Sequence, residues 1–224
     1  MSLPYDRLSQ ISRLSRRGFL GIATTTLVAC GGASIRAADL FPTPIQTEGP
    51  FYPDKLPLDQ DNDLLQVKGS TVTAKGTVAH VYGRILGPDG KPINGAIVEI
   101  WQCDANGVYV HSKGGDRAKM DAGFQGFGTC KVGADGTYRF RTIRPVPYAG
   151  RTPHIHYKIK LGETELLTTQ CYVNDDPGNA KDGIFKRITD PASQKALIAD
   201  FVASADGKEM NAQFDVVLGK TPQA

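Results

Sequence analysis

The chain has 224 residues, of which 26 are Lys or Arg and 23 are Asp or Glu, so its formal net charge is +3. Several of the positive charges lie in the first 20 residues, which leaves the rest of the chain near neutral. No basic face interleaved with aromatic residues is present, so composition argues against nucleic acid as a partner. Residues 39–224 are enough for one domain that buries its own hydrophobic core.

The N-terminal segment has the pattern of a targeting signal. Arg16 and Arg17 precede an uncharged run from Phe19 to Ile35, which is short for a membrane span and contains glycines and threonines. The segment resembles a twin-arginine export signal, so residues 1–38 are predicted to be a signal and the protein to be exported from a bacterial cytoplasm to the periplasm. An amphipathic first helix is the structural alternative.

A second signal lies within the same segment. The run from Leu27 to Cys30 reads Leu-Val-Ala-Cys and resembles a lipobox, in which Cys30 would be lipidated and would anchor the protein to a membrane. The alternative is cleavage elsewhere, after Ala37 or Ala38. Both alternatives place the mature protein outside the cytoplasm.

The remaining cysteines are Cys103, Cys130 and Cys171. An odd number in an oxidising compartment does not suit a disulfide framework. Because no Cys-x-x-Cys pair occurs, a zinc site built on cysteine is not expected either. These residues are predicted to be small apolar side chains of the core.

Alternating apolar residues and glycine-rich turns predict an all-β fold, an antiparallel β-sandwich. One helix is expected from Ala192 to Ala203, after the start signal Asp190-Pro191. Residues 40–66 are rich in Pro, Asp and Gln and predict an irregular arm, with residues 47–53 packed near an opening of the sandwich. The expected strands are 78–86, 96–101, 127–132, 137–143, 155–161, 165–173 and 213–218.

The best local clue to chemistry is His154-Ile155-His156. On a strand, residues i and i+2 face the same side, so both imidazoles would reach one metal ion while Ile155 faces the core. Alone, such a pair also fits two structural histidines that are half-buried and hydrogen-bonded. The three prolines between Arg144 and Pro153 restrict the loop that carries Tyr148 and Arg151, which favours a positioned site.

Several motifs in a fixed order are similar to the intradiol ring-cleavage dioxygenases, and most similar to protocatechuate 3,4-dioxygenase subunits. The resemblance covers about residues 47–173. The motifs are Thr47-Glu48-Gly49-Pro50-Phe51-Tyr52, Trp101-Gln102, Gly107-Val108-Tyr109, Gly136 to Pro145, Pro147-Tyr148 and Arg151-Thr152-Pro153-His154-Ile155-His156.

The resemblance implies a non-haem iron(III) site held by Tyr109, Tyr148, His154 and His156. Two tyrosinates and a hydroxide would balance the charge of Fe(III), which can remove the phenol protons at neutral pH. The implied substrates are a catechol-type compound and O2. The implied reaction opens the ring between its two hydroxylated carbons and gives a cis,cis-muconate-type diacid.

The resemblance also assigns residues around that metal. Tyr148 would act as a base for the catechol protons, and Arg151 would stabilise negative charge developing on the substrate. Gln170 would steady Arg151 or the substrate. His80 is expected to be structural or exposed; so is His111, which by its spacing could instead face the side of Tyr109.

The chain departs from well-known members of that family. The loop from Tyr148 to Arg151 is very short, so the resemblance does not name the substrate. No helical dimerisation region precedes the sandwich, although a homo- or hetero-oligomer fits the family. Two other hypotheses remain at this stage: an exported β-sandwich that binds carbohydrate or another ligand without ring cleavage, and a copper or zinc protein that uses only the two histidines.

Overall fold

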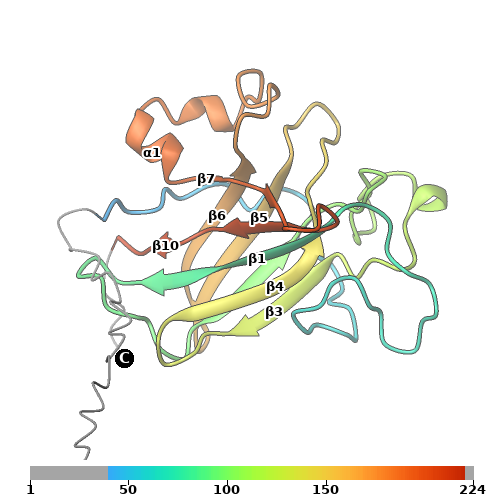
Figure 1. Cartoon of the computed structure of the whole chain (residues 1–224), viewed down its shortest axis with the longest axis horizontal. Helices are drawn as coiled ribbons and strands as arrows, with labels where there is room; N and C mark the ends of the chain where they lie inside the picture. Colours follow the sequence, from blue (N-terminus) through green and yellow to red (C-terminus); the bar gives the residue numbers. More distant parts are fainter. Residues whose placement is uncertain (1–39, 220–224) are drawn as a thin grey trace, which may run out of the picture. The chain divides into compact units, whose positions relative to one another are not determined.

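In the computed structural model, residues 40–219 are described, and they form two five-stranded sheets with a single short α-helix (Figure 1). The first sheet has the order β10-β1-β9-β8, with β4 also paired to β1, and the second has the order β3-β2-β5-β6-β7. The elements are β1 (Val78–Leu86), β2 (Ile97–Trp101), β3 (Phe127–Lys131), β4 (Thr137–Ile143), β5 (His154–Leu161), β6 (Thr164–Val173), α1 (Pro191–Lys195), β7 (Ile198–Ala199), β8 (Val202–Ala203), β9 (Met210–Gln213) and β10 (Val216–Val217).

The core follows from alternation along the strands. Alternate residues of β1 and β5 are buried in one cluster: Ala79, Val81 and Ile85 from β1, and Ile155, Tyr157 and Ile159 from β5. Burying one such valine or isoleucine side chain contributes about 1.5–3 kcal/mol. The predicted all-β sandwich is therefore confirmed, and β1 and β4 have the predicted bounds.

The C-terminal strand differs from its prediction. Residues 213–218 do not form one strand: β9 and β10 are separate, and both pair with β1 in parallel. The ladder breaks at Phe214 and Asp215, where an Asp215 carboxylate oxygen accepts a hydrogen bond from the Arg84 backbone N–H at 2.8 Å. Gly83 makes this possible, because a Cβ there would lie 2.0 Å from the Phe214 carbonyl oxygen.

The predicted helix is present but shorter than expected. Asp190 caps it by accepting from the Ser193 backbone N–H, and Pro191 occupies the first turn. The helix ends at Lys195 instead of Ala203. The prediction is wrong beyond that point because β7 and β8 follow; β7 pairs in parallel with the end of β6.

The N-terminal arm lies along both sheets. The backbone N–H of Thr43 donates to Val217 at 2.9 Å, and that of Gln46 donates to Thr168 at 2.9 Å. The Thr169 hydroxyl donates to the Pro44 carbonyl at 2.7 Å. These contacts tie residues 43–46 to β10 and β6.

The described cysteines are all free thiols. Cys103 and Cys171 are buried, as predicted for core residues, whereas Cys130 is partly exposed. The predicted signal and lipobox lie outside the described residues. Between residues 40 and 219, no helix has the length and apolar character needed to cross a membrane.

Candidate metal centre

His154 and His156 project from the same face of β5, opposite the buried Ile155, as the strand periodicity predicted. Both histidines are 1% exposed. Their Nε2 atoms lie 3.1 Å apart. Two imidazole nitrogens therefore converge on one point beneath the arm.

The hydrogen bond at the other ring nitrogen of His154 sets its tautomer. Its Nδ1 lies 2.6 Å from the Thr152 carbonyl oxygen, so Nδ1 carries the proton and Nε2 presents a lone pair. Metal-ligating histidines commonly donate their second N–H to a backbone carbonyl in this way. Burial, and then the Arg151 charge, lowers the pKa of His154 to about 3, so its imidazole is neutral, the form that binds metal.

Tyr109 reaches the same point from the loop between β2 and β3. Asp104 holds this loop, since its Oδ1 accepts from the backbone N–H groups of Asn106 at 2.8 Å and Val108 at 3.0 Å. Gly107 completes the turn with φ +76°. The Tyr109 side chain is buried, and its hydroxyl has no hydrogen-bond partner within the described chain.

Tyr148 comes from the loop between β4 and β5. The backbone N–H of Arg151 donates to the Tyr148 carbonyl at 2.7 Å, which closes a two-residue turn. Ala149 and Gly150 occupy the turn with φ values of +42° and +80°. The turn itself thus adds no large side chain, and Tyr148 remains partly exposed.

The four side chains form one cluster of rings. Ring centroids lie 4.9 Å apart for Tyr109 and Tyr148, 5.5 Å for Tyr148 and His154, and 6.1 Å for Tyr109 and His156. Among residues 40–219, no three His, Cys, Asp or Glu side chains gather into a metal site. Any metal at this point would therefore need the tyrosines as ligands.

The donor chemistry fits such a metal. Burial raises the pKa of both Tyr109 and Tyr148, so without a cation both phenols keep their protons. A bound cation of high charge reverses that preference. The unpartnered Tyr109 hydroxyl also fits, because buried polar groups normally have a partner.

The arm and β2 enclose His156. The Trp101 ring stacks on its imidazole, with centroids 4.8 Å apart and planes 9° from parallel. A Cβ on Gly49 would lie 3.3 Å from the His156 Cε1, and Gly49 has φ +74°. Phe51 stacks on Tyr109 at 5.0 Å. The arm therefore forms one wall of the site.

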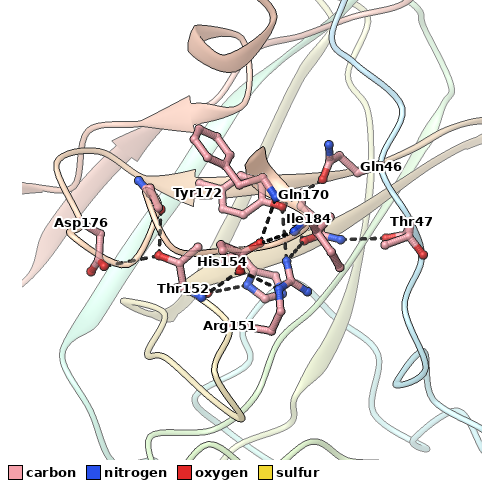
Figure 2. Close-up of polar contacts among 12 residues, drawn as sticks. Gln46, Thr47, Arg151, Thr152, His154, Gln170, Tyr172, Asp176 and Ile184 are labelled. Atoms are coloured by element: carbon pink, nitrogen blue, oxygen red, sulfur yellow. Dashed lines mark hydrogen bonds and ion pairs between the residues drawn. The ribbon is translucent and has the colours of Figure 1, made fainter. Parts of the chain in front are cut away.

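Arg151 lies beside the cluster in a polar network (Figure 2). Its Nη2 donates to Gln170 Oε1 at 2.7 Å and to the Tyr172 hydroxyl at 3.3 Å. Gln170 Nε2 donates to the Thr47 carbonyl at 2.8 Å, and the Tyr172 hydroxyl donates to Gln46 Oε1 at 2.9 Å. Gln170 thus holds Arg151 against the arm.

The other two histidines lie outside the cluster. His80 Nε2 contacts a Glu209 carboxylate oxygen at 2.8 Å on the first sheet, in keeping with its expected structural role. His111 Nδ1 accepts from the Lys113 backbone N–H at 3.0 Å. The His111 ring packs edge-on against Phe51 at 5.7 Å, and the His111 backbone N–H donates to the Tyr109 carbonyl at 2.8 Å.

A surface cavity of about 280 Å³ adjoins the cluster. Tyr148 and Arg151 line it from one side, and Asp176, Gly178 and Lys181 line it from the loop after β6. The two groups expected to meet a substrate therefore lie next to an opening.

The family model of Dioxygenase_C, described as dioxygenase, matches residues 47–220. The protocatechuate 3,4-dioxygenase beta chain of Burkholderia cepacia is 37% identical over an alignment of 173 residues, and the match covers 72% of this chain and 72% of that protein. The chain belongs to the intradiol ring-cleavage dioxygenase family.

Other members of the intradiol dioxygenase family extend the comparison. The 6-chlorohydroxyquinol 1,2-dioxygenase of Cupriavidus pinatubonensis is 36% identical over 66% of this chain and 56% of that protein. Among solved structures, the dioxygenase domain of a dioxygenase and carbohydrate-binding fusion from Streptomyces sp. SirexAA-E has TM-score 0.62 and 34% identity, covering 81% of this chain and 100% of that one.

Two residues that bind Arg151, Tyr172 and Asp182, were not predicted from the sequence. Tyr172 lies two positions after Gln170 on a predicted strand, so the two side chains were expected to face the same side. This spacing could have placed Tyr172 near Arg151. Asp182 accepts from Arg151 Nε at 2.7 Å but comes from an irregular loop without periodicity. No local pattern pointed to it.

Proposed function

We propose that this chain is a non-haem iron(III) dioxygenase. It opens a catechol-type ring between the two hydroxylated carbons and yields a cis,cis-muconate-type diacid that contains both atoms of O2. The observation that supports this most strongly is the convergence of two buried histidines and two tyrosines on one point. Family membership supplies the reaction class.

Tyr109, Tyr148, His154 and His156 would hold the iron. The buried histidines are neutral, because burial lowers the pKa of both. Two tyrosinates then supply the negative charge that Fe(III) requires. When bound, ferric iron supplies Lewis acidity, which favours the deprotonated catechol.

Tyr148 is the proposed proton acceptor. It is the only one of the four side chains that is partly exposed, and it lines the opening. Since burial raises the pKa of Tyr148, its phenolate is a strong base toward a catechol hydroxyl. The proton is taken up at the phenol oxygen.

Arg151 is the proposed electrostatic partner of the substrate. Its Nε and Nη2 are used by protein acceptors, and Nη1 makes no hydrogen bond within residues 40–219. One N–H edge of the guanidinium is thus left to stabilise negative charge on the ring oxygens. Gln170 acts on Arg151 instead of the substrate, because both ends of its amide bond protein atoms.

The wall formed by Phe51, Trp101 and Phe127 keeps water from the inner side of the site. These residues pack with Cys103 and Tyr109 in one apolar cluster. Charges in such a place interact more strongly than in water. The open side, at Tyr148, is the one from which a substrate would enter.

A visible spectrum with metal analysis tests this function. Charge transfer from tyrosinate to Fe(III) should make the purified protein reddish, with one iron bound for each chain. A binding module without metal, or a zinc protein, would be colourless. Colourless protein that stays colourless after loading with ferric iron would contradict the proposal.

Export is proposed from the N-terminal sequence, which carries Arg16, Arg17 and the lipobox-like Cys30. Fractionation of the producing bacteria should find the protein outside the cytoplasm. Replacing both arginines with lysine should retain it inside, and Cys30→Ala should release it from the membrane fraction if that residue is lipidated. Cytoplasmic protein in the unmodified strain would contradict export.

A further inference from the structure

Asp182 is a fully buried carboxylate beside the site. Its side chain has 0% exposure, and it comes from the loop that follows β6. A carboxylate buried this way must be compensated by hydrogen bonds or charge. Its acceptor oxygens receive four hydrogen bonds: Oδ2 from Arg151 Nε (2.7 Å) and the Thr152 N–H (3.0 Å), and Oδ1 from the N–H groups of Ile184 (2.9 Å) and Phe185 (2.9 Å).

The two oxygens of Asp182 serve different segments. Oδ1 is held by Ile184 and Phe185, in the loop of Asp182 itself. Oδ2 binds Arg151 and its neighbour Thr152, in the loop that carries Tyr148. The carboxylate therefore ties a rigid turn after β6 to the loop that delivers the guanidinium.

Arg151 has its orientation fixed from two directions. Asp182 accepts a hydrogen bond from Nε, and Gln170 and Tyr172 accept hydrogen bonds from Nη2. A guanidinium is planar and rigid, so fixing two of its nitrogens determines where the third points. That third nitrogen, Nη1, is the one without a protein partner in the described chain.

We propose that Asp182 is a positioning residue that aims the Arg151 guanidinium at the substrate. It acts through Arg151 and does not touch the substrate. The inference rests on the proposed function, because it assigns Arg151 to charge developing during ring cleavage. A misplacement of about 1 Å in such a group can cost about 100-fold in rate.

The test uses iron-loaded Asp182→Asn. Asn keeps the shape and one acceptor oxygen for the turn, but it removes the charge that holds Nε. We expect kcat to fall about 10- to 100-fold. The dissociation constant for catechol, titrated without oxygen, should change less than about 3-fold, since the loss lies in the transition state. The red colour should be retained.

A double-mutant cycle separates positioning from scaffolding. In an Arg151→Gln background, Asp182→Asn should change kcat less than about 3-fold, because the residue through which it acts is gone. Equal losses in both backgrounds would overturn the inference. Asp63→Asn is the matched control: Asp63 also pairs with an arginine, Arg141, at 3.0 Å, but this pair lies on the first sheet, outside the candidate site. A loss equal to that of Asp182→Asn would also overturn it.

Arg151→Lys keeps Asp182 in place, so it serves if Asp182→Asn does not fold. A lysine cannot engage Asp182 and Gln170 and still present a third, fixed donor. We expect it to lose at least as much kcat as Asp182→Asn; wild-type kcat would overturn the inference. If the wild type cleaves a catechol and Asp182→Asn is equally active, the role of Asp182 is refuted but the proposed function stands. If the wild type is inactive on every catechol, the proposed function is refuted as well.

Discussion

The Nε2 atoms of His154 and His156 lie 3.1 Å apart, and each side chain is 1% exposed. Because the Thr152 carbonyl takes the Nδ1 proton of His154, its Nε2 lone pair points at this meeting point. Tyr109 and Tyr148 come to the same place from two separate loops. The four proposed ligands therefore lie together, and their roles can be measured without knowing the substrate.

Tyr109→Phe should remove most of the visible colour of the iron-loaded protein, since one charge-transfer donor is lost. The same variant should leave the melting temperature of metal-free protein unchanged or higher. The reason is that the Tyr109 hydroxyl is buried without a partner, so its removal sacrifices no hydrogen bond. Absorbance spectra and thermal unfolding check the two halves. Full colour in this variant would mean that Tyr109 is not a ligand.

Two glycines form a matched pair, one inside the arm and one shortly after it. Gly49 and Gly69 have similar left-handed backbones, with φ of +74° and +80°. Alanine at either position should cost about 1–2 kcal/mol of stability. A methyl group added at Gly49 would lie 3.3 Å from the His156 ring, whereas one added at Gly69 would meet nothing within 4 Å. Gly49→Ala should therefore shift the charge-transfer band and Gly69→Ala should not; identical spectra would show that the arm does not position His156.

Stability of the metal-free protein should fall with acid through His154. Its pKa is lowered to about 3 in the native state, against about 6.5 when unfolded, because burial disfavours the charged form. The unfolded chain then binds more protons between these pH values, so the free energy of unfolding rises with pH in that window.

For His154 alone the expected loss from pH 7 to pH 5 is about 2 kcal/mol. Urea unfolding of metal-free wild type and His154→Gln at both pH values measures it. His154→Gln should show a smaller pH dependence because glutamine does not titrate. Equal pH dependence in the two proteins would rule out a depressed histidine pKa.

Much of the fold follows from local alternation. The bounds of β1 and β4, and the shared face of His154 and His156, are dictated by a period of two. The short strands β7 and β10 are not, because each has two residues and exists only through pairing with a longer neighbour. The predicted length of helix α1 was too great for the same reason. Its start is set by a local cap, but its end is set by the strand pairing that follows.

Some residues of the candidate site could be predicted from the sequence and others could not. Tyr109, Tyr148 and the histidines belong to ordered motifs, and the structure brings all four together. Asp182 lies 31 residues from Arg151 in the chain, in a loop that has no pattern of its own. Its role depends on a contact that only the folded chain creates.

Intradiol ring cleavage is tested by adding catechol, protocatechuate and hydroxyquinol to the iron-loaded protein without oxygen and then admitting oxygen. At least one compound should shift the charge-transfer spectrum before oxygen is added. Oxygen should then be consumed mole for mole, the resting spectrum should return, and the product should be a cis,cis-muconate-type diacid. No spectral change with any catechol, or a ring opened outside the two hydroxylated carbons, would show that the chain is not an intradiol dioxygenase.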